Sequence, residues 1–184
     1  MSTELILGGA RSGKSALALQ RAQANGKAVT FIATAQAGDA EMAARIKQHR
    51  AERPPHWALV EEPIALADVL LAHAAPQHCL LVDCLTLWLS NLLGNEDADH
   101  QQFVSQRDAL LQVLPQLPGH LIMVSNEVGL GITPLGEISR RFVDETGRLH
   151  QQLATLCEQV TFVAAGLPLT LKPQHPEQIP PITP

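Results

Sequence analysis

The stretch GGARSGKS, from Gly8 to Ser15, decides the fold of this chain of 184 residues. Its spacing lets successive backbone N–H groups surround a phosphate, while the Lys14 ammonium reaches the outer phosphate oxygens and the Ser15 hydroxyl holds Mg²⁺. The apolar run 5–7 precedes it, and a helical pattern from Lys14 to about Ala24 follows. A strand, a glycine-rich loop and a helix in this order predict a phosphate-binding loop, and the alternative is an incidental glycine-rich turn.

Apolar runs and helical patterns alternate along the rest of the chain. We predict strands at 28–33, 78–82, 121–124 and 160–164, and helices at 40–50, 66–74, 85–93, 103–114 and 136–158. This alternation is typical of an α/β fold, in which a mostly parallel sheet has helices on both faces. The length allows one such domain, which we expect over residues 1–166.

Residues 167–184 are rich in proline, which cannot donate to a helix or to a central strand. We therefore expect an extended C-terminal tail, either disordered or wrapped over the surface.

Composition and charge exclude several classes of function. The net charge of −5 at pH 7 argues against a nucleic-acid partner, which needs a clustered basic surface. The three cysteines show neither zinc-ligand spacing nor a disulfide framework, which favours a reducing compartment. No apolar stretch is long enough to span a bilayer. We expect a cytoplasmic protein without membrane insertion.

Asp83 and His49 are the first candidate site residues outside the loop. Asp83 ends an apolar run, and a carboxylate at the C-terminal tip of a parallel strand is where a Mg²⁺ ligand sits in phosphate-loop proteins. It is alternatively the N-cap of the next helix.

His49 shares a helical stripe with Met42 and Ile46, which indicates a partly buried core residue. It also stands beside a cationic turn that contains Arg50 and Arg53. In that setting the imidazole is alternatively a nucleophile that attacks phosphorus.

The segment SNEVGLG, from Ser125 to Gly131, follows the strand predicted at 121–124. Ligands bind at the C-terminal ends of strands in α/β sheets, so this segment is a candidate part of the site. The alternative is a turn in which Asn126 and Glu127 satisfy backbone groups. Residue types alone do not decide between the two.

Six blocks in order resemble one enzyme family: GGARSGKS at Gly8, IATAQ at Ile32, DAEMAARI leading to His49, RPPHW at Arg53, VDCLTLWLSN at Val82 and SNEVGLGITP at Ser125. They are similar to the bifunctional adenosylcobinamide kinase and adenosylcobinamide-phosphate guanylyltransferase of cobalamin biosynthesis. The resemblance spans about residues 4–165. It implies a RecA-like P-loop NTPase fold and two reactions, phosphorylation of the aminopropanol hydroxyl of adenosylcobinamide by ATP or GTP, then transfer of GMP from GTP onto that phosphate.

The resemblance also assigns roles to residues. It makes His49 the histidine that carries GMP as a covalent intermediate, and Lys14 the second catalytic residue. The implied nucleotide contacts are Gly8, Gly9, Ala10, Arg11, Ser12, Gly13, Lys14, Ser15, Thr34, Ala35, Gln36, Arg50, Ala51, Glu52, Arg53, Glu61 and Asp83, with Ser15 and Asp83 as the Mg²⁺ ligands. His150 departs from the family pattern, in which many relatives have Asn. A homo-oligomer, specifically a trimer, is implied as well.

Two rival functions keep the phosphate loop but not the histidine chemistry. One is a P-loop kinase of another small alcohol or of a nucleoside, which has no use for a nucleophilic His49. The other is a non-enzymatic nucleotide switch, against which stands the lack of an NKxD motif for reading guanine.

Overall fold

The computed structural model describes residues 2–51, 53–94 and 100–173, and for Arg45, His49 and His100 it describes the backbone only. One sheet of seven strands forms its centre, in the order β3-β2-β4-β5-β1-β6-β7. All neighbouring strands are parallel except β7, which is antiparallel to β6. The strands are β1 Ser2–Gly8, β2 Ala28–Ala33, β3 Ala58–Glu61, β4 His78–Asp83, β5 His120–Asn126, β6 Gln159–Ala164 and β7 Leu167–Lys172.

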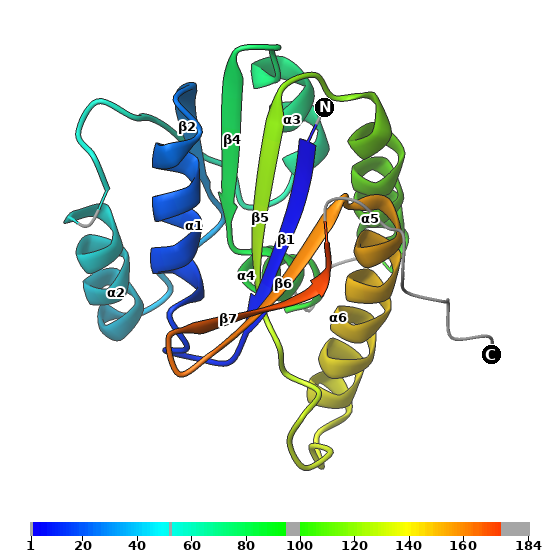
Figure 1. Ribbon diagram of the computed structural model, residues 1–184. Coiled ribbons are helices and arrows are strands. Elements are labelled where there is room, and N and C mark those ends of the chain that lie inside the picture. Colours follow the sequence, from blue (N-terminus) through cyan, green and yellow to red (C-terminus); the bar gives the residue numbers. More distant parts are fainter. Residues whose placement is uncertain (1, 52, 95–99, 174–184) are drawn as a thin grey trace.

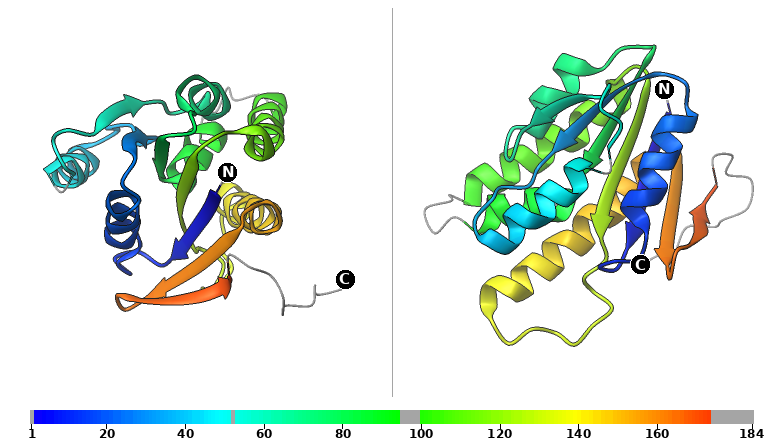
Figure 2. Two further views of the ribbon diagram at one scale, coloured as in Figure 1. Left: turned by 45° about the horizontal axis from the view of Figure 1, so that its top comes forward. Right: turned by 90° about the vertical axis from the view of Figure 1, so that its left-hand side faces the viewer.

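Helices cover both faces of the sheet, as the alternating pattern predicted (Figures 1 and 2). Helices α1 and α2 lie on one side and α3 to α6 on the other. Their bounds are α1 Lys14–Ala24, α2 Ala40–Ala51, α3 Leu66–His73, α4 Leu85–Leu93, α5 His100–Val113 and α6 Glu137–Leu156, and a short 3₁₀ turn spans Leu114–Gln116.

The central strands divide their side chains between two cores. In β1, Leu5 and Leu7 pack with α3 to α6, whereas Ile6 points to the opposite face, where Ala18 and Ala22 of α1 cover it. This alternation follows from the period of two in a strand, and continuous apolar runs such as residues 5–7 mark strands that are buried on both faces. The larger core lies under α3 to α6, with Trp88 fully buried in it.

Two strands escaped prediction, and both lie at the edges of the sheet. Strand β3 has no fully buried residue, so its pattern lacks the apolar run that marks the central strands. Strand β7 lies in the segment that we expected to be an extended tail. Its Pro168 is tolerated because an edge strand leaves half of its backbone groups unpaired. Ala165 and Gly166 both have positive φ, of 51° and 78°, and form the tight turn from β6 into β7.

Candidate active site

The phosphate loop connects the C-terminal end of β1 to the first residue of α1, and backbone contacts fix its shape. A Cβ atom at Gly8 would lie 2.5 Å from both the Ser12 Oγ and the Val163 carbonyl oxygen, so only glycine fits there. Gly13 has a φ of 98°, which other residues rarely adopt. The Gly166 N–H donates to the Ser12 carbonyl at 2.8 Å, so the β6–β7 turn supports the outer side of the loop. The loop that the sequence predicted is therefore preformed.

Lys14 is buried, and its Nζ donates to the Gly9 carbonyl oxygen at 3.1 Å. Burial lowers the pKa of its ammonium, and the charge of Asp83 opposes that shift. The Ser12 Oγ is also buried, and it has no hydrogen-bond partner among the described residues. A buried cation beside an unpaired hydroxyl, at the start of a helix, fits an anionic ligand such as a phosphate.

Asp83 is the last residue of β4, and one strand, β5, lies between β4 and β1. Burial lowers the pKa of both Lys14 and Arg53, and the charge of the Asp83 carboxylate offsets part of that lowering. The N-cap residue of α4 is Cys84, one position later, and the Cys84 side chain forms no capping hydrogen bond. Asp83 lies at the same edge of the sheet as the phosphate loop, where a Mg²⁺ ligand is expected.

Thr34 follows β2 and braces the tip of β4. Its hydroxyl donates to the Cys84 carbonyl oxygen at 2.7 Å and accepts from the Cys84 N–H at 3.0 Å. The carbonyl of Thr34 accepts from the side-chain amide of Asn91 at 2.7 Å. Its side chain is fully buried, whereas Ala35 is half-buried and Gln36 is exposed. Of these three predicted nucleotide contacts, Thr34 is thus engaged within the protein, and the other two face outward.

His49 lies in the last turn of α2, which ends at Ala51, and Glu52 lies outside the described residues. The cationic residues beside it have clear partners. Arg50 forms an exposed ion pair with Glu61, with Nη2 and Oε1 3.0 Å apart. The Arg53 guanidinium stacks on the ring of Phe31, 4.3 Å from its centroid. Burial lowers the pKa of Arg53, and the neighbouring charge of Arg50 adds to that effect.

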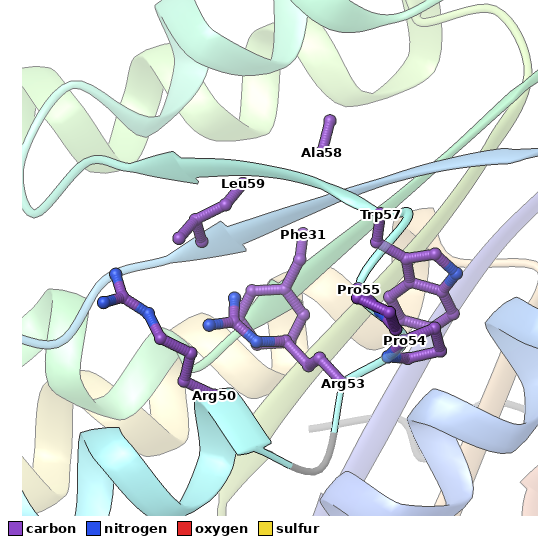
Figure 3. Close-up of a pocket in the computed structure, with 8 residues that line it drawn as sticks. All are labelled: Phe31, Arg50, Arg53, Pro54, Pro55, Trp57, Ala58 and Leu59. Carbon is purple, nitrogen blue, oxygen red and sulfur yellow. The ribbon is translucent and has the colours of Figure 1, made fainter.

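Both arginines line a small pocket of about 140 Å³ beside the edge of the sheet (Figure 3). The guanidinium of Arg53 lies across Phe31 in this view, and Trp57 stands at the far end of the pocket. Its complete lining is Phe31, Arg50, Arg53, Pro54, Pro55, Trp57, Ala58 and Leu59. Cationic groups above apolar and aromatic walls suit a ligand that has both a phosphate and a planar or apolar part.

The carboxylates of Glu61 and Glu62, at the end of β3, have different partners. The Glu62 carboxylate accepts hydrogen bonds from the N–H groups of Ile64 and Ala65, both at 2.8 Å, just before α3 begins. Glu61 instead faces Arg50 at the pocket. Of the two carboxylates, Glu61 is the one beside the cationic pocket, and its role as a nucleotide contact stays a prediction.

The tip of β5 carries a polar cluster that sequence reasoning did not assemble. Ser125 contacts His150 of α6, and Asn126 donates to the Thr86 hydroxyl at 2.8 Å. The sequence offered one signal for it: His150 stands among leucines on the apolar face of α6, where Leu149 and Leu153 are fully buried. A buried polar residue on such a face requires a partner.

In the described ranges, no helix is both long and apolar enough to cross a membrane. The same residues contain no group of three or more His, Cys, Asp or Glu side chains that could hold a metal ion by themselves.

Comparison with solved structures identifies the fold. The chain superposes on the RadB recombinase with a TM-score of 0.50 at 15% identity, covering 88% of this chain and 73% of that one. It superposes on an ATPase of a bacterial type III secretion system with a TM-score of 0.51 at 11% identity, covering 92% and 57%. These likenesses, together with the phosphate loop at the tip of β1, make the fold that of a RecA-like P-loop NTPase.

Comparison with known sequences identifies the family. The bifunctional adenosylcobalamin biosynthesis protein CobP of Pseudomonas aeruginosa is 60% identical over 169 residues, which cover 92% of this chain and 96% of that protein. The bifunctional adenosylcobalamin biosynthesis protein CobU of Escherichia coli K12 is 37% identical over 179 residues, covering 91% and 98%. The sequence model of one family matches residues 4–171. The chain belongs to that family, the cobinamide kinase / cobinamide phosphate guanyltransferases.

Proposed function

We propose that this protein phosphorylates the aminopropanol hydroxyl of adenosylcobinamide and then transfers GMP from GTP to the resulting phosphate, giving adenosyl-GDP-cobinamide. Family membership makes the chain a bifunctional cobinamide kinase and cobinamide phosphate guanylyltransferase. The observation that carries the proposal is the preformed phosphate loop with the buried Lys14 at its end, and Arg50 and Arg53 add a second, cationic pocket after α2.

In the kinase step, residues 8–15 hold the phosphates of ATP or GTP through backbone N–H groups, and Lys14 neutralises the charge that develops on the transferred group. Phosphoryl transfer depends mainly on positioning and on charge neutralisation rather than on proton transfer. The burial of Lys14 supports this role, because a desolvated ammonium interacts more strongly with a phosphate than an exposed one does.

The Ser15 hydroxyl and the Asp83 carboxylate would hold Mg²⁺. The fit is good in kind: Mg²⁺ takes oxygen ligands, and it is usually bound through one or two protein groups together with substrate phosphates and water. Ser15 lies half-buried at the start of α1, and Asp83 acts on Lys14 across the tip of the sheet. When bound, the ion would neutralise phosphate charge.

In the guanylyl step, a ring nitrogen of His49 attacks the α-phosphorus of GTP. The new P–N bond replaces the P–O bond to the outer phosphates, and pyrophosphate leaves. A phosphate oxygen of adenosylcobinamide phosphate then attacks the same phosphorus, and the P–N bond breaks to free the histidine. Arg50, Arg53 and Glu61, with Ala51 and Glu52, are proposed to hold the nucleotide during this step, together with Ala35 and Gln36.

We also propose that the protein works in the cytoplasm as a homo-oligomer, specifically a trimer, with no nucleic-acid partner. Three free, buried thiols support a reducing compartment. The loop between β5 and α6 supports assembly, because Leu130, Ile132 and Leu135 are 81%, 98% and 97% exposed. Light scattering tests this point, and a monomeric mass at micromolar concentration would contradict it.

The deciding experiment incubates the purified protein with GTP that is radiolabelled at its α-phosphate, and then tests for acid-labile, base-stable label on the chain. We expect label on the wild type and none on His49→Ala. The variant should still phosphorylate adenosylcobinamide, because the phosphate loop is untouched. Loss of both activities in a folded variant would contradict this division of labour, and absence of label from a wild type that binds GTP would favour the kinase of another alcohol.

A further inference from the structure

Three consecutive residues at the C-terminal tip of β5 alternate between two neighbours. Ser125 and Glu127 face His150 of α6, whereas Asn126 points to Thr86 at the start of α4. We call Ser125, Asn126 and Glu127 the β5 tip. Because side chains alternate along a strand, this arrangement joins the tip to two different helices.

The contacts of His150 are specific and buried. Its Nε2 lies 2.7 Å from the Ser125 Oγ, and both residues are shielded from solvent, at 6% and 0% exposure. Its Nδ1 lies 3.6 Å from the Glu127 Oε2, which is longer than a hydrogen bond but close enough for electrostatic attraction. The other oxygen of Glu127 accepts from the Gly129 N–H at 2.6 Å. Burial lowers the pKa of His150, which favours a neutral ring that accepts from the serine hydroxyl.

The β5 tip lies between the two parts of the phosphate site. Strand β5 is flanked by β1, which leads into the phosphate loop, and by β4, which ends at Asp83. The Glu127 N–H donates to the Gly8 carbonyl oxygen at 3.0 Å. On the other side, the Asn126 side chain bonds the Thr86 hydroxyl, which is itself 3.1 Å from the Cys84 Sγ beside Asp83. A shift of the tip therefore changes the relation between the loop and the carboxylate.

We infer that His150 is a positioning residue for phosphoryl transfer: from α6 it fixes the β5 tip, and the tip in turn borders the space where the acceptor hydroxyl meets the terminal phosphate of the nucleotide. This inference rests on the proposed kinase activity. Removing the imidazole leaves the buried Ser125 hydroxyl without its partner, and small displacements of groups that align reactants cost large factors in rate.

A purely structural role for His150 makes a different prediction. If the residue only stabilises α6, any substitution on the buried face of that helix lowers stability and activity together. Thr146 offers the matched control. It lies one turn earlier on α6, is fully buried, and donates within the helix to the Phe142 carbonyl at 2.6 Å. Thr146→Ala perturbs the same helix, and the hydrogen bond that it removes lies wholly within α6.

The experiment measures phosphorylation of adenosylcobinamide and, separately, ATP and GTP binding by calorimetry, for the wild type, His150→Ala, His150→Gln and Thr146→Ala. We expect kcat of His150→Ala to fall about tenfold, since alignment of the acceptor is lost. Nucleotide affinity should change by less than about twofold, because in the described part of the chain His150 reaches residues 8–15 only indirectly, through the backbone bond of Glu127 to Gly8. His150→Gln should recover much of the rate, since its amide reaches the Ser125 Oγ from nearly the position of Nε2.

Other outcomes overturn the inference. Equal rates per folded molecule in His150→Ala and Thr146→Ala would reduce His150 to a stabilising residue. If His150→Ala does not fold, Ser125→Ala replaces it, because that change removes only the hydroxyl, and an unchanged kcat there overturns the inference as well. A wild type that fails to phosphorylate adenosylcobinamide would contradict the proposed function itself, and the assay of the wild type reveals this before any variant is compared.

Discussion

The phosphate loop and the segment from α2 to Arg53 are both expected to contact nucleotide phosphates, yet they are built in opposite ways. The loop is held by backbone hydrogen bonds, and Lys14 is buried beside it. In α2, by contrast, none of the side chains that the structure describes is fully buried, and the helix stands at the periphery of the molecule (Figure 2). One part of the site is preorganised, and the other is only lightly attached to the fold.

This difference matches the demands of the two reactions. Transfer of a phosphoryl group needs fixed donors in a dry site, because preorganised charges do not have to reorganise during the reaction. His49, which we propose carries GMP from one substrate to the other, instead has to approach two partners in turn. The exposed Arg50–Glu61 pair suits that task, since an exposed ion pair contributes little free energy and is exchanged for a phosphate at small cost.

The largest expected effect is on the kinase rate, from a substitution in the preorganised phosphate loop. Lys14→Met should lower the kinase rate by roughly 100- to 1000-fold, because it removes a preorganised charge from the transferred phosphate. The free energy of unfolding without nucleotide should not fall, since the buried ammonium is costly to desolvate and methionine is apolar. Steady-state rates and urea unfolding measure the two quantities. A clear loss of stability would mean that Lys14 holds the loop together, and the contrast with α2 would weaken.

An intermediate effect is expected at Arg53. Arg53→Lys should slow guanylyl transfer about tenfold, because an ammonium cannot stack on Phe31 or bind a phosphate through two parallel N–H groups. The kinase rate should change much less. Arg50→Lys is the control, since its partner Glu61 is exposed and accepts either cation. If both variants lower the rate of guanylyl transfer by the same factor, the stacking of Arg53 on Phe31 does not contribute to that rate.

The smallest expected effect is on the free energy of unfolding, from a substitution in α2. Ile46→Ala in α2 should reduce the free energy of unfolding by about 1 kcal/mol or less, whereas Ile6→Ala in β1 should cost about 2–5 kcal/mol. Ile46 is half-buried and Ile6 is fully buried, so truncation to alanine leaves a larger cavity at Ile6 than at Ile46. Urea denaturation compares them directly. Equal losses would show that α2 is packed as firmly as the core.

The sequence was most informative where burial is complete. The helix at Leu85–Leu93 and the strand at Ala28–Ala33 were predicted with the bounds observed, because apolar runs between polar breaks mark buried elements. Edge strands gave no such signal. In β7 every residue but one is exposed, and its proline argued against a strand, although at an edge the missing N–H costs nothing.

The candidate site also has a part that the sequence predicted and a part that only the fold reveals. The phosphate loop has a fixed spacing that backbone geometry imposes, so its place at the tip of β1 was confirmed. The link between Ser125 and His150 joins residues that are 25 positions apart in the chain, and it depends on how α6 packs on the sheet. No local pattern encodes such a contact. The choice between Glu61 and Glu62 also needed the fold, because only the start of α3 shows that Glu62 is already engaged.

The turn between β6 and β7, whose Gly166 N–H supports Ser12, has a consequence for biosynthesis. A ribosome makes the phosphate loop before strands β5 and β6, yet β1 lies between those two strands, and the loop is supported by a turn that follows β6. A nascent chain therefore has no finished nucleotide site until residue 166 has left the exit tunnel. Products of interrupted translation would carry the whole signature sequence and remain unable to consume ATP or GTP.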